Sequence, residues 1–125
     1  AGDHGTTYGG NPICCAAASA VINTLSADQL WDRADIIRAA IFEGLDSEIA
    51  DGDLIRDRRG VGLMIGIEPT VPTENLVRMA LDRHVLINVA GGNTIRLLPP
   101  LVMNTDDARH VGATVADIVN SLKDS

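Results

Sequence analysis

Two hydroxyl side chains near the start of the chain have the types and spacing of an anion-binding site. In the segment "GDHGTTYGGNP" (residues 2–12), Thr6 and Thr7 are neighbours among four glycines. Glycines let the backbone turn with successive N–H groups pointing one way, and hydroxyls add further donors. A helix predicted to begin at Pro12 adds the positive end of its dipole. These donors suit a phosphate, although a loop whose hydroxyls only cap its own turn explains the same residues equally well.

A single arginine between apolar residues is the second candidate for chemistry. In "NTIRLLPPL", strand alternation places Arg96 on one face with Thr94 and Leu98. Ile95 and Leu97 then face the other way. The planar guanidinium fork can hold a carboxylate through two parallel hydrogen bonds. Taken by itself, this stretch fits an arginine on an exposed strand without a ligand better.

Other patterns exclude several kinds of site. "GVGLMIG" (residues 60–66) alternates like a strand and opens no helix, so it is not a dinucleotide-binding signature. The acidic residues 46–53 lack the spacing of a calcium loop. The remaining metal-binding side chains are His4, His84, His110, Cys14 and Cys15. Their spacing matches no ligand pattern, so we predict no metal site. We interpret the histidines as surface or packing residues and the two cysteines as core residues.

Composition limits the partners and the setting of the chain. A net charge of −7 over 125 residues argues against nucleic acid or an anionic membrane as the main partner. The two adjacent cysteines are poorly placed to bridge each other, which favours a reducing, cytoplasmic compartment. Apolar runs are too short to span a membrane. Only one lysine is present, Lys123, close to the end of the sequence.

Hydrophobic periodicity predicts the elements that would position these residues. They are a helix at 12–25 with Asn11 as its N-cap, a long helix launched by a capping box at 26–29, a strand pair from Ile55 to Ile67, a short helix at 76–81, a hairpin around 91–93, and a last helix capped by Thr105. This order predicts an α+β fold in which helices cover a small, mostly antiparallel sheet.

The same periodicity predicts the core. In the strand pair, Val61, Leu63, Ile65 and Ile67 alternate with Gly60, Gly62, Met64 and Gly66. Glycines on one face of a strand indicate that another segment approaches closely. The helical stripes are Leu30, Ala34, Ile37, Ile41, Leu45 and Ile49 in the long helix, and Val111, Val115, Ile118, Val119 and Leu122 in the last.

Three stretches together resemble a known family. "GDHGTTYGGNPICCAAASAV", "RRGVGLMIGIE" and "LINVAGGNTIRLLPPLVM" occur in the order and at the spacing seen near the end of class III pyridoxal-phosphate-dependent aminotransferases. The resemblance covers essentially the whole chain. The third stretch is more similar to the acetylornithine and succinylornithine branch than to ornithine or 4-aminobutyrate aminotransferases.

The resemblance implies a fold and a role for each candidate. Residues 1–26 would form a cofactor-phosphate arm with its connecting helix, and residues 27–125 the C-terminal small domain of a fold type I aminotransferase. In a homodimer, Thr7 would bind the phosphate of the neighbouring subunit's pyridoxal 5'-phosphate, and Thr6 would lie beside the acylated substrate. Arg96 would hold the α-carboxylate of the amino acid.

The implied reaction transfers the terminal amino group of N2-acetylornithine to 2-oxoglutarate, giving glutamate, and runs in reverse during arginine biosynthesis. The family's Schiff-base lysine belongs to an upstream segment, and Lys123 does not match it. We therefore expect a C-terminal portion of an enzyme, without a catalytic residue of its own and inactive by itself. The alternatives are a succinylornithine or other ornithine-type transaminase, a stand-alone module that binds a small molecule or anion, and a purely structural domain.

Overall fold

The computed structural model describes residues 5–123, and the chain divides into two compact units, Ala1–Trp31 and Asp32–Ser125. The boundary between the predicted segments 1–26 and 27–125 remains a proposal. His4 lies outside the described residues.

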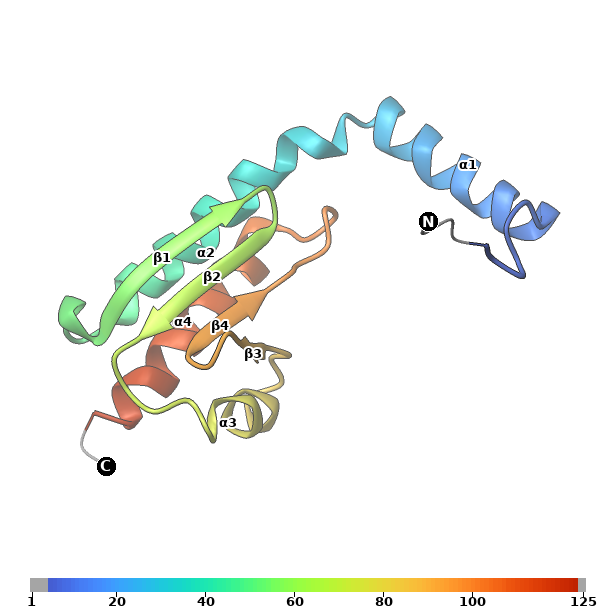
Figure 1. Ribbon diagram of the computed structural model, residues 1–125. Coiled ribbons are helices and arrows are strands. Elements are labelled where there is room, and N and C mark those ends of the chain that lie inside the picture. Colours follow the sequence, from blue (N-terminus) through green and yellow to red (C-terminus); the bar gives the residue numbers. More distant parts are fainter. Residues whose placement is uncertain (1–4, 124–125) are drawn as a thin grey trace. The chain divides into compact units, whose positions relative to one another are not determined.

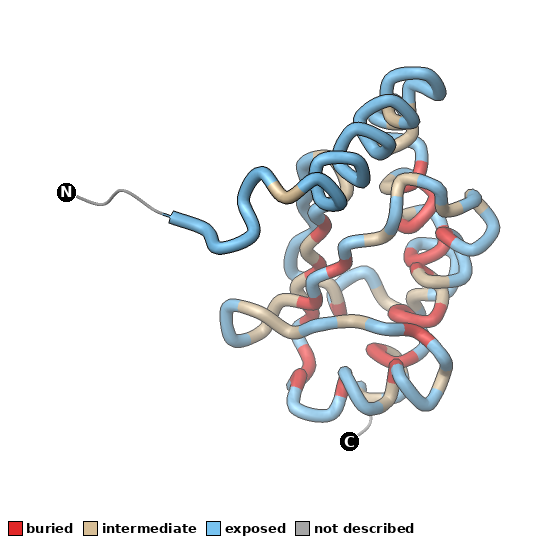
Figure 2. The backbone as a smooth tube through the Cα atoms, turned by 90° about the vertical axis from the view of Figure 1, so that its right-hand side faces the viewer, coloured by how far each residue is buried: buried red, intermediate tan, exposed pale blue. Residues whose placement is uncertain are grey.

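The first unit contains one long helix, α1 (Pro12–Ala27). As predicted, Asn11 caps it: its side-chain oxygen accepts hydrogen bonds from the backbone N–H groups of Ile13, at 2.9 Å, and Cys14, at 3.5 Å. None of the α1 residues is buried, and Figure 2 shows the helix exposed along its length. The predicted core position of Cys14 and Cys15 is therefore wrong, since both cysteines are exposed.

The capping box predicted at 26–29 is wrong. Ser26 lies inside the last turn of α1, and Gln29 has a φ of 47°, outside the helical region. After a short 3-10 turn (Leu30–Asp32), α2 (Arg33–Glu48) begins with Asp32 at the N-cap position, and Asp32 makes no capping side-chain bond. The first helix therefore continues through the residues that looked like the start of the second.

The second unit is built on a four-stranded antiparallel sheet with strand order β1-β2-β4-β3. A 3-10 turn (Gly52–Leu54) leads into β1 (Ile55–Val61), which forms a hairpin with β2 (Met64–Pro69); β3 (Asn88–Ala90) forms another with β4 (Thr94–Leu97). Figure 1 shows α2 and α4 (Thr105–Ser121) behind this sheet. The predicted α+β class is confirmed.

One face of the sheet and two helices enclose the core. The fully buried large side chains include Ile37, Ile41, Leu45, Ile65, Ile67, Ile95, Val115, Ile118 and Val119. The ends of the predicted helical stripes are only partly buried: Leu30, Ala34, Ile49, Val111 and Leu122. The short helix α3 (Leu76–Asp82) packs against α4 and β3 and adds Leu76 and Ala80 to the core.

The predicted alternation, which places Val61 on one face with Ile65 and Ile67, is wrong at Val61. A two-residue turn at Gly62 and Leu63 pairs Val61 with Met64, so both face away from the helices, and Val61 is 88% exposed. The turn reverses the alternation that appears continuous in the sequence. The close approach predicted at the glycines is present at Gly60, where an added Cβ would lie 3.0 Å from the Cδ of Arg38 in α2.

The last helix begins one residue earlier than predicted. Its N-cap is Asn104, whose side-chain oxygen accepts from the backbone N–H of Asp107 at 2.7 Å, and Thr105 is the first helical residue. Asp106 and Asp107 occupy the first turn, where their negative charges interact favourably with the positive end of the helix dipole.

Candidate functional site

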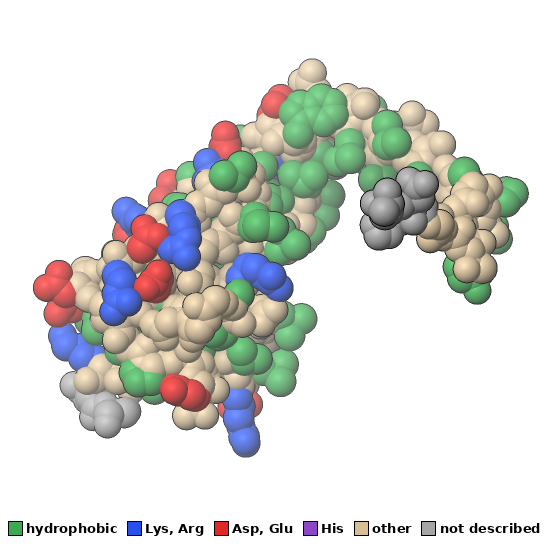
Figure 3. Space-filling model, in the orientation of Figure 1, with side chains coloured by type: hydrophobic (Ala, Val, Ile, Leu, Met, Phe, Trp, Pro, Cys, Tyr) green, Lys and Arg blue, Asp and Glu red, His purple; other side chains and the backbone are tan. Residues whose placement is uncertain are grey.

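The face of the sheet opposite α2 and α4 presents a row of polar side chains. Arg59 on β1 pairs in register with Gly66 on β2, which in turn pairs with Arg96 on β4. The flanking residues on β2 and β4 are buried on the opposite face, so this row faces outward. Figure 3 shows basic and acidic side chains intermingled over β1 and β2 on this side.

Arg96 occupies the position that the sequence predicted for it. Ile95 and Leu97 are buried against the helices, whereas Arg96 and Leu98 are exposed. Within residues 5–123, the Arg96 guanidinium makes no hydrogen bond or ion pair. It borders a hollow of about 400 Å³ whose other lining residues are Arg59, Gly60, Val61, Met64, Ile65, Gly66, Ala90, Gly91 and Thr94. The arrangement leaves a guanidinium available to a carboxylate in a largely apolar hollow.

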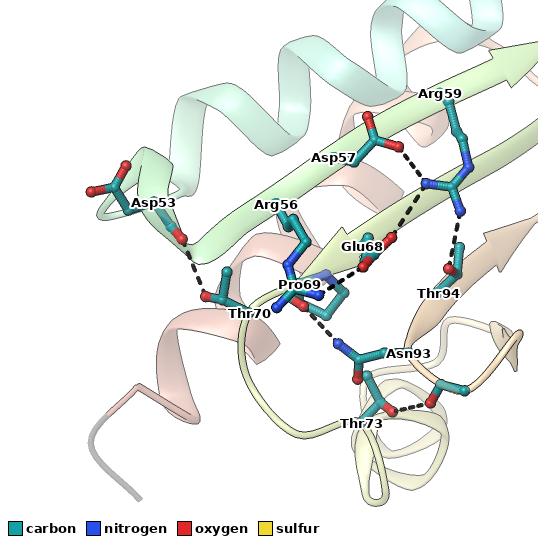
Figure 4. Close-up of polar contacts among 11 residues, drawn as sticks. Asp53, Arg56, Asp57, Arg59, Glu68, Pro69, Thr70, Thr73, Asn93 and Thr94 are labelled. Carbon is teal, nitrogen blue, oxygen red and sulfur yellow. Dashed lines mark hydrogen bonds and ion pairs between the residues drawn. The ribbon is translucent and has the colours of Figure 1, made fainter.

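Arg59 is held in place by three groups, unlike Arg96. Its guanidinium pairs with Asp57 on its own strand, lies 3.5 Å from an Oε of Glu68, and donates to Thr94 Oγ1 at 3.2 Å (Figure 4). Arg56 takes the other Glu68 oxygen at 3.1 Å. The hydrogen bond to the Asp57 carboxylate raises the pKa of Arg59 above its ordinary value.

Sequence reasoning missed this network, although its spacing was visible. Asp57 and Arg59 are two residues apart in "RDRRG", and side chains at that spacing share one face of a strand. The partners Glu68 and Thr94 come from other strands, and only the register brings them to Arg59.

The turn that precedes Arg96 is fixed at two points. The Asn93 side-chain amide donates to the Pro69 carbonyl at 2.7 Å, and the Thr73 hydroxyl donates to the Gly92 carbonyl at 3.3 Å (Figure 4). Gly91 and Gly92 have φ values of 60° and 88°, in the region that glycine adopts most readily. These bonds hold the β3–β4 hairpin against the end of β2 and so fix the strand that carries Arg96.

Thr6 and Thr7 lie together in the first unit, while Arg96 belongs to the second. The Gly9 N–H donates to the Thr6 carbonyl at 3.4 Å, and the Asn11 N–H to that of Tyr8 at 3.1 Å. Both threonines are exposed, and within residues 5–123 their hydroxyls make no hydrogen bond. The hydroxyls are therefore available as donors to an anion.

The start of α1 contributes less to such a site than the sequence suggested. Pro12 has no N–H, and Asn11 accepts from the N–H groups of Ile13 and Cys14. The two hydroxyls fit a phosphate, but as donors on one exposed segment they do not by themselves make a complete anion site. Lys123, the one lysine, is ion-paired with Asp51 at 3.0 Å.

Two further features concern metals and membranes. Among residues 5–123, no group of three or more His, Cys, Asp or Glu side chains is arranged to hold a metal ion. In the same range no single helix is long and apolar enough to cross a membrane, and only the interrupted pair Pro12–Ala27 and Leu30–Glu48, counted together, has that length and composition.

Comparison with known proteins defines the class to which this fold and these residues belong. Residues 1–119 match the family Aminotransferase class-III. The chain therefore belongs to the class-III aminotransferase family, which in general depends on pyridoxal phosphate.

The more particular likeness is to acetylornithine aminotransferases. That of Methanothermobacter thermautotrophicus is 39% identical over 121 residues, covering 97% of this chain and 31% of the relative. The acetylornithine aminotransferase of Agrobacterium fabrum is 40% identical over 124 residues, covering 98% of this chain and 31% of the relative. The chain thus spans about a third of the length of the curated relatives that it matches.

Solved aminotransferase structures share the fold. Ornithine δ-aminotransferase of Plasmodium falciparum matches with a TM-score of 0.83 and 26% identity, over 99% of this chain and 32% of that one. Acetylornithine aminotransferase from Elizabethkingia anophelis matches with a TM-score of 0.77 and 28% identity, over 97% of this chain and 33% of that one.

Proposed function

We propose that this chain is the C-terminal part of a pyridoxal-phosphate-dependent enzyme that transfers the terminal amino group between N2-acetylornithine and 2-oxoglutarate. The relatives named acetylornithine aminotransferases, at 39–40% identity over nearly all of the chain, support this reaction. When bound, the cofactor supplies the electron sink for transamination. This chain contributes binding groups, and the lysine that reacts with the cofactor comes from another part of the enzyme.

The observation that carries the proposal is the unpaired guanidinium of Arg96. Its charge is unbalanced by any acidic side chain among residues 5–123, while the neighbouring arginine, Arg59, is bound by Asp57 and Glu68. An amino acid or 2-oxo acid brings the carboxylate that this position lacks. Arg96 therefore orients the substrate by its α-carboxylate.

The two threonine hydroxyls have separate roles in this proposal. We assign Thr7 to the cofactor phosphate of the neighbouring subunit in a homodimer, and Thr6 to the acylated end of the substrate. Their exposed, unbonded hydroxyls support these assignments. Residues 1–26 then act as the arm that enters the neighbouring site, and residues 27–125 as the small domain, in a cytoplasmic enzyme of arginine biosynthesis.

The test compares two arginines in the complete enzyme that carries this chain. Arg96→Ala removes the carboxylate ligand, so we expect kcat/KM for 2-oxoglutarate to fall about 100-fold, the loss expected for a paired, charge-assisted hydrogen bond. Arg78→Ala is the matched control, because Arg78 is exposed on α3 and has no hydrogen bond or ion pair within the described residues. Equal activity of Arg96→Ala and the control variant contradicts the assignment.

Substrate choice is tested by competition. With N2-acetylornithine and N2-succinylornithine offered together to the enzyme, we expect the acetyl compound to be consumed faster. Faster consumption of the succinyl compound places the enzyme in the other branch and leaves the carboxylate role of Arg96 untouched.

A further inference from the structure

We propose that Thr94 is a second ligand of the carboxylate held by Arg96, and that Arg59 is the residue that positions its hydroxyl. This inference rests on the proposed function of Arg96 and adds a hydroxyl donor to that subsite. It also gives a role to the network on β1 and β2, which the proposed reaction does not otherwise use.

The hydrogen-bonding state of Thr94 is the first step. A threonine hydroxyl has one hydrogen to donate and two lone pairs. Thr94 Oγ1 accepts from Arg59 Nη2 at 3.2 Å and, within residues 5–123, donates to no group. Arginine has no acceptor, so this bond occupies a lone pair and leaves the hydroxyl hydrogen free to point into the hollow that Arg96 also borders.

The spacing of Thr94 and Arg96 suits one carboxylate. They are two residues apart on β4 and on the same outward face, so their Cα atoms are about 6.8 Å apart. A carboxylate with a hydrogen bond of about 2.8 Å at each oxygen spans such a separation. The guanidinium then binds one oxygen or both, and the hydroxyl binds the edge nearer to Thr94.

The charges around Arg59 explain why the anion goes to Arg96. Arg59 and Arg56 share the carboxylates of Asp57 and Glu68 across β1 and β2 (Figure 4). Two positive and two negative charges are thereby balanced. Arg59 thus orients Thr94 without competing strongly for the ligand, and the unbalanced positive charge in the hollow belongs to Arg96.

Gly66 leaves space for the ligand between these groups. It pairs with both Arg59 and Arg96, and a Cβ added there would lie 3.2 Å from Thr94 Cγ2 and 3.6 Å from Arg59 Cγ. The contact with Thr94 is tight and would push the threonine aside, whereas the contact with Arg59 is an ordinary van der Waals contact. The absence of a side chain at Gly66 therefore keeps the hydroxyl accessible and in contact with Arg59.

The first experiment removes only the hydroxyl. In the complete enzyme, Thr94→Val keeps the shape of the side chain, whereas Thr94→Ser keeps the donor. We expect Thr94→Val to raise KM for 2-oxoglutarate about 10-fold, as for a lost hydrogen bond to a charged group, with kcat changed less than twofold. Thr94→Ser should restore KM to within about twofold of the original enzyme. Equal KM values for the Val variant and the original enzyme overturn the proposal.

The second experiment asks whether Arg59 acts through Thr94. Arg59→Lys keeps the charge but loses the planar fork that reaches Asp57, Glu68 and Thr94 together. We expect it to raise KM about three- to fivefold in the original enzyme and to have no further effect in the Thr94→Val background. Additive effects of the two substitutions show that Arg59 acts by another route and overturn its positioning role.

The outcomes separate this inference from the proposed function. If Arg96→Ala leaves kcat/KM unchanged, the carboxylate site itself is misplaced and both proposals fall. If Arg96→Ala lowers kcat/KM while Thr94→Val leaves KM unchanged, the function stands and only the role of Thr94 is rejected. Arg78 lies on α3, whereas the network lies on β1, β2 and β4, so Arg78→Ala is the control for both the Arg96 and the Thr94 variants.

Discussion

Gly44 of α2 and Gly112 of α4 allow the two core helices to approach each other at backbone distance. A Cβ added to Gly44 would lie 2.0 Å from the Arg109 carbonyl oxygen, and one added to Gly112 would lie 1.9 Å from that of Ile41. Both contacts are far shorter than real side chains show, and the atoms in the way belong to the backbone. The helices that support the sheet are therefore held close by two glycines.

Gly112→Ala should destabilise the second unit strongly. The added methyl group can be accommodated only if α4 moves away from α2, and overpacking of a core costs about 1–3 kcal/mol or more. The measurement is the urea midpoint of unfolding. Gly52→Ala serves as the control, since a Cβ there meets no atom within 4 Å. A midpoint for Gly112→Ala equal to that of the control would contradict the close helix packing.

Asn11→Ala should loosen the first turn of α1. Asn11 caps two backbone N–H groups, and removal of such a cap costs about 1 kcal/mol. We expect faster amide hydrogen exchange at Ile13 and Cys14. Asn75→Ala is a matched control because Asn75 is the N-cap residue of α3 but makes no capping bond with its side chain. Unchanged exchange at both residues would show that the cap does not hold this turn.

Asp51 should titrate below its ordinary pKa of 3.8. The hydrogen bond from the backbone N–H of Asp53 is the largest single cause, followed by the hydrogen bond from Lys123 and its charge, and all three favour the charged carboxylate. Lys123→Gln should raise the pKa of Asp51 only part of the way to 3.8, because the backbone bond remains. NMR titration of the carboxyl carbon measures the shift. A pKa at or above 3.8 in this variant would show that the lysine was the main cause.

The same carboxylate sets a pH dependence of stability at low pH. The pKa of Asp51 is lower in the folded chain than in the unfolded chain. The Asp51 carboxylate therefore stabilises the folded chain above pH 3.8, and this stabilisation is lost as the pH falls through the folded pKa. Asp51→Asn should flatten this part of the stability curve. Denaturation midpoints between pH 2 and pH 5, for the variant and the original chain, test it. Parallel curves would contradict it.

The isolated chain should form no stoichiometric, site-specific adduct with pyridoxal phosphate. Its one lysine, Lys123, lies just beyond the end of α4 and is half exposed and ion-paired with Asp51. Borohydride reduction followed by intact-mass analysis and peptide mapping should show only slow labelling of Lys123 and the amino terminus. A rapid one-to-one adduct would mean that this chain forms a cofactor site of its own.

Local sequence signals predicted much of the framework because their causes are local. The Asn11-Pro12 start of α1 depends on one side chain and its neighbouring N–H groups. The outward position of Arg96 follows from strand alternation between the apolar residues Ile95 and Leu97, and Gly91 and Gly92 mark the hairpin that precedes it. The order of the predicted helices and strands indicates the α+β class, and the family likeness of the three quoted stretches adds the candidate roles of Thr6 and Thr7.

Tertiary structure decided which of these residues act together. The sequence identifies Arg96 as outward-facing, but the register of three strands places Arg59 and Gly66 in its row. The same register brings the Thr94 hydroxyl within hydrogen-bonding distance of Arg59. The turn at Gly62 sends Val61 outward, although its alternation with Ile65 seemed to continue. Side chains distant in sequence meet through strand pairing and helix contact, and these depend on the whole core rather than on any short stretch.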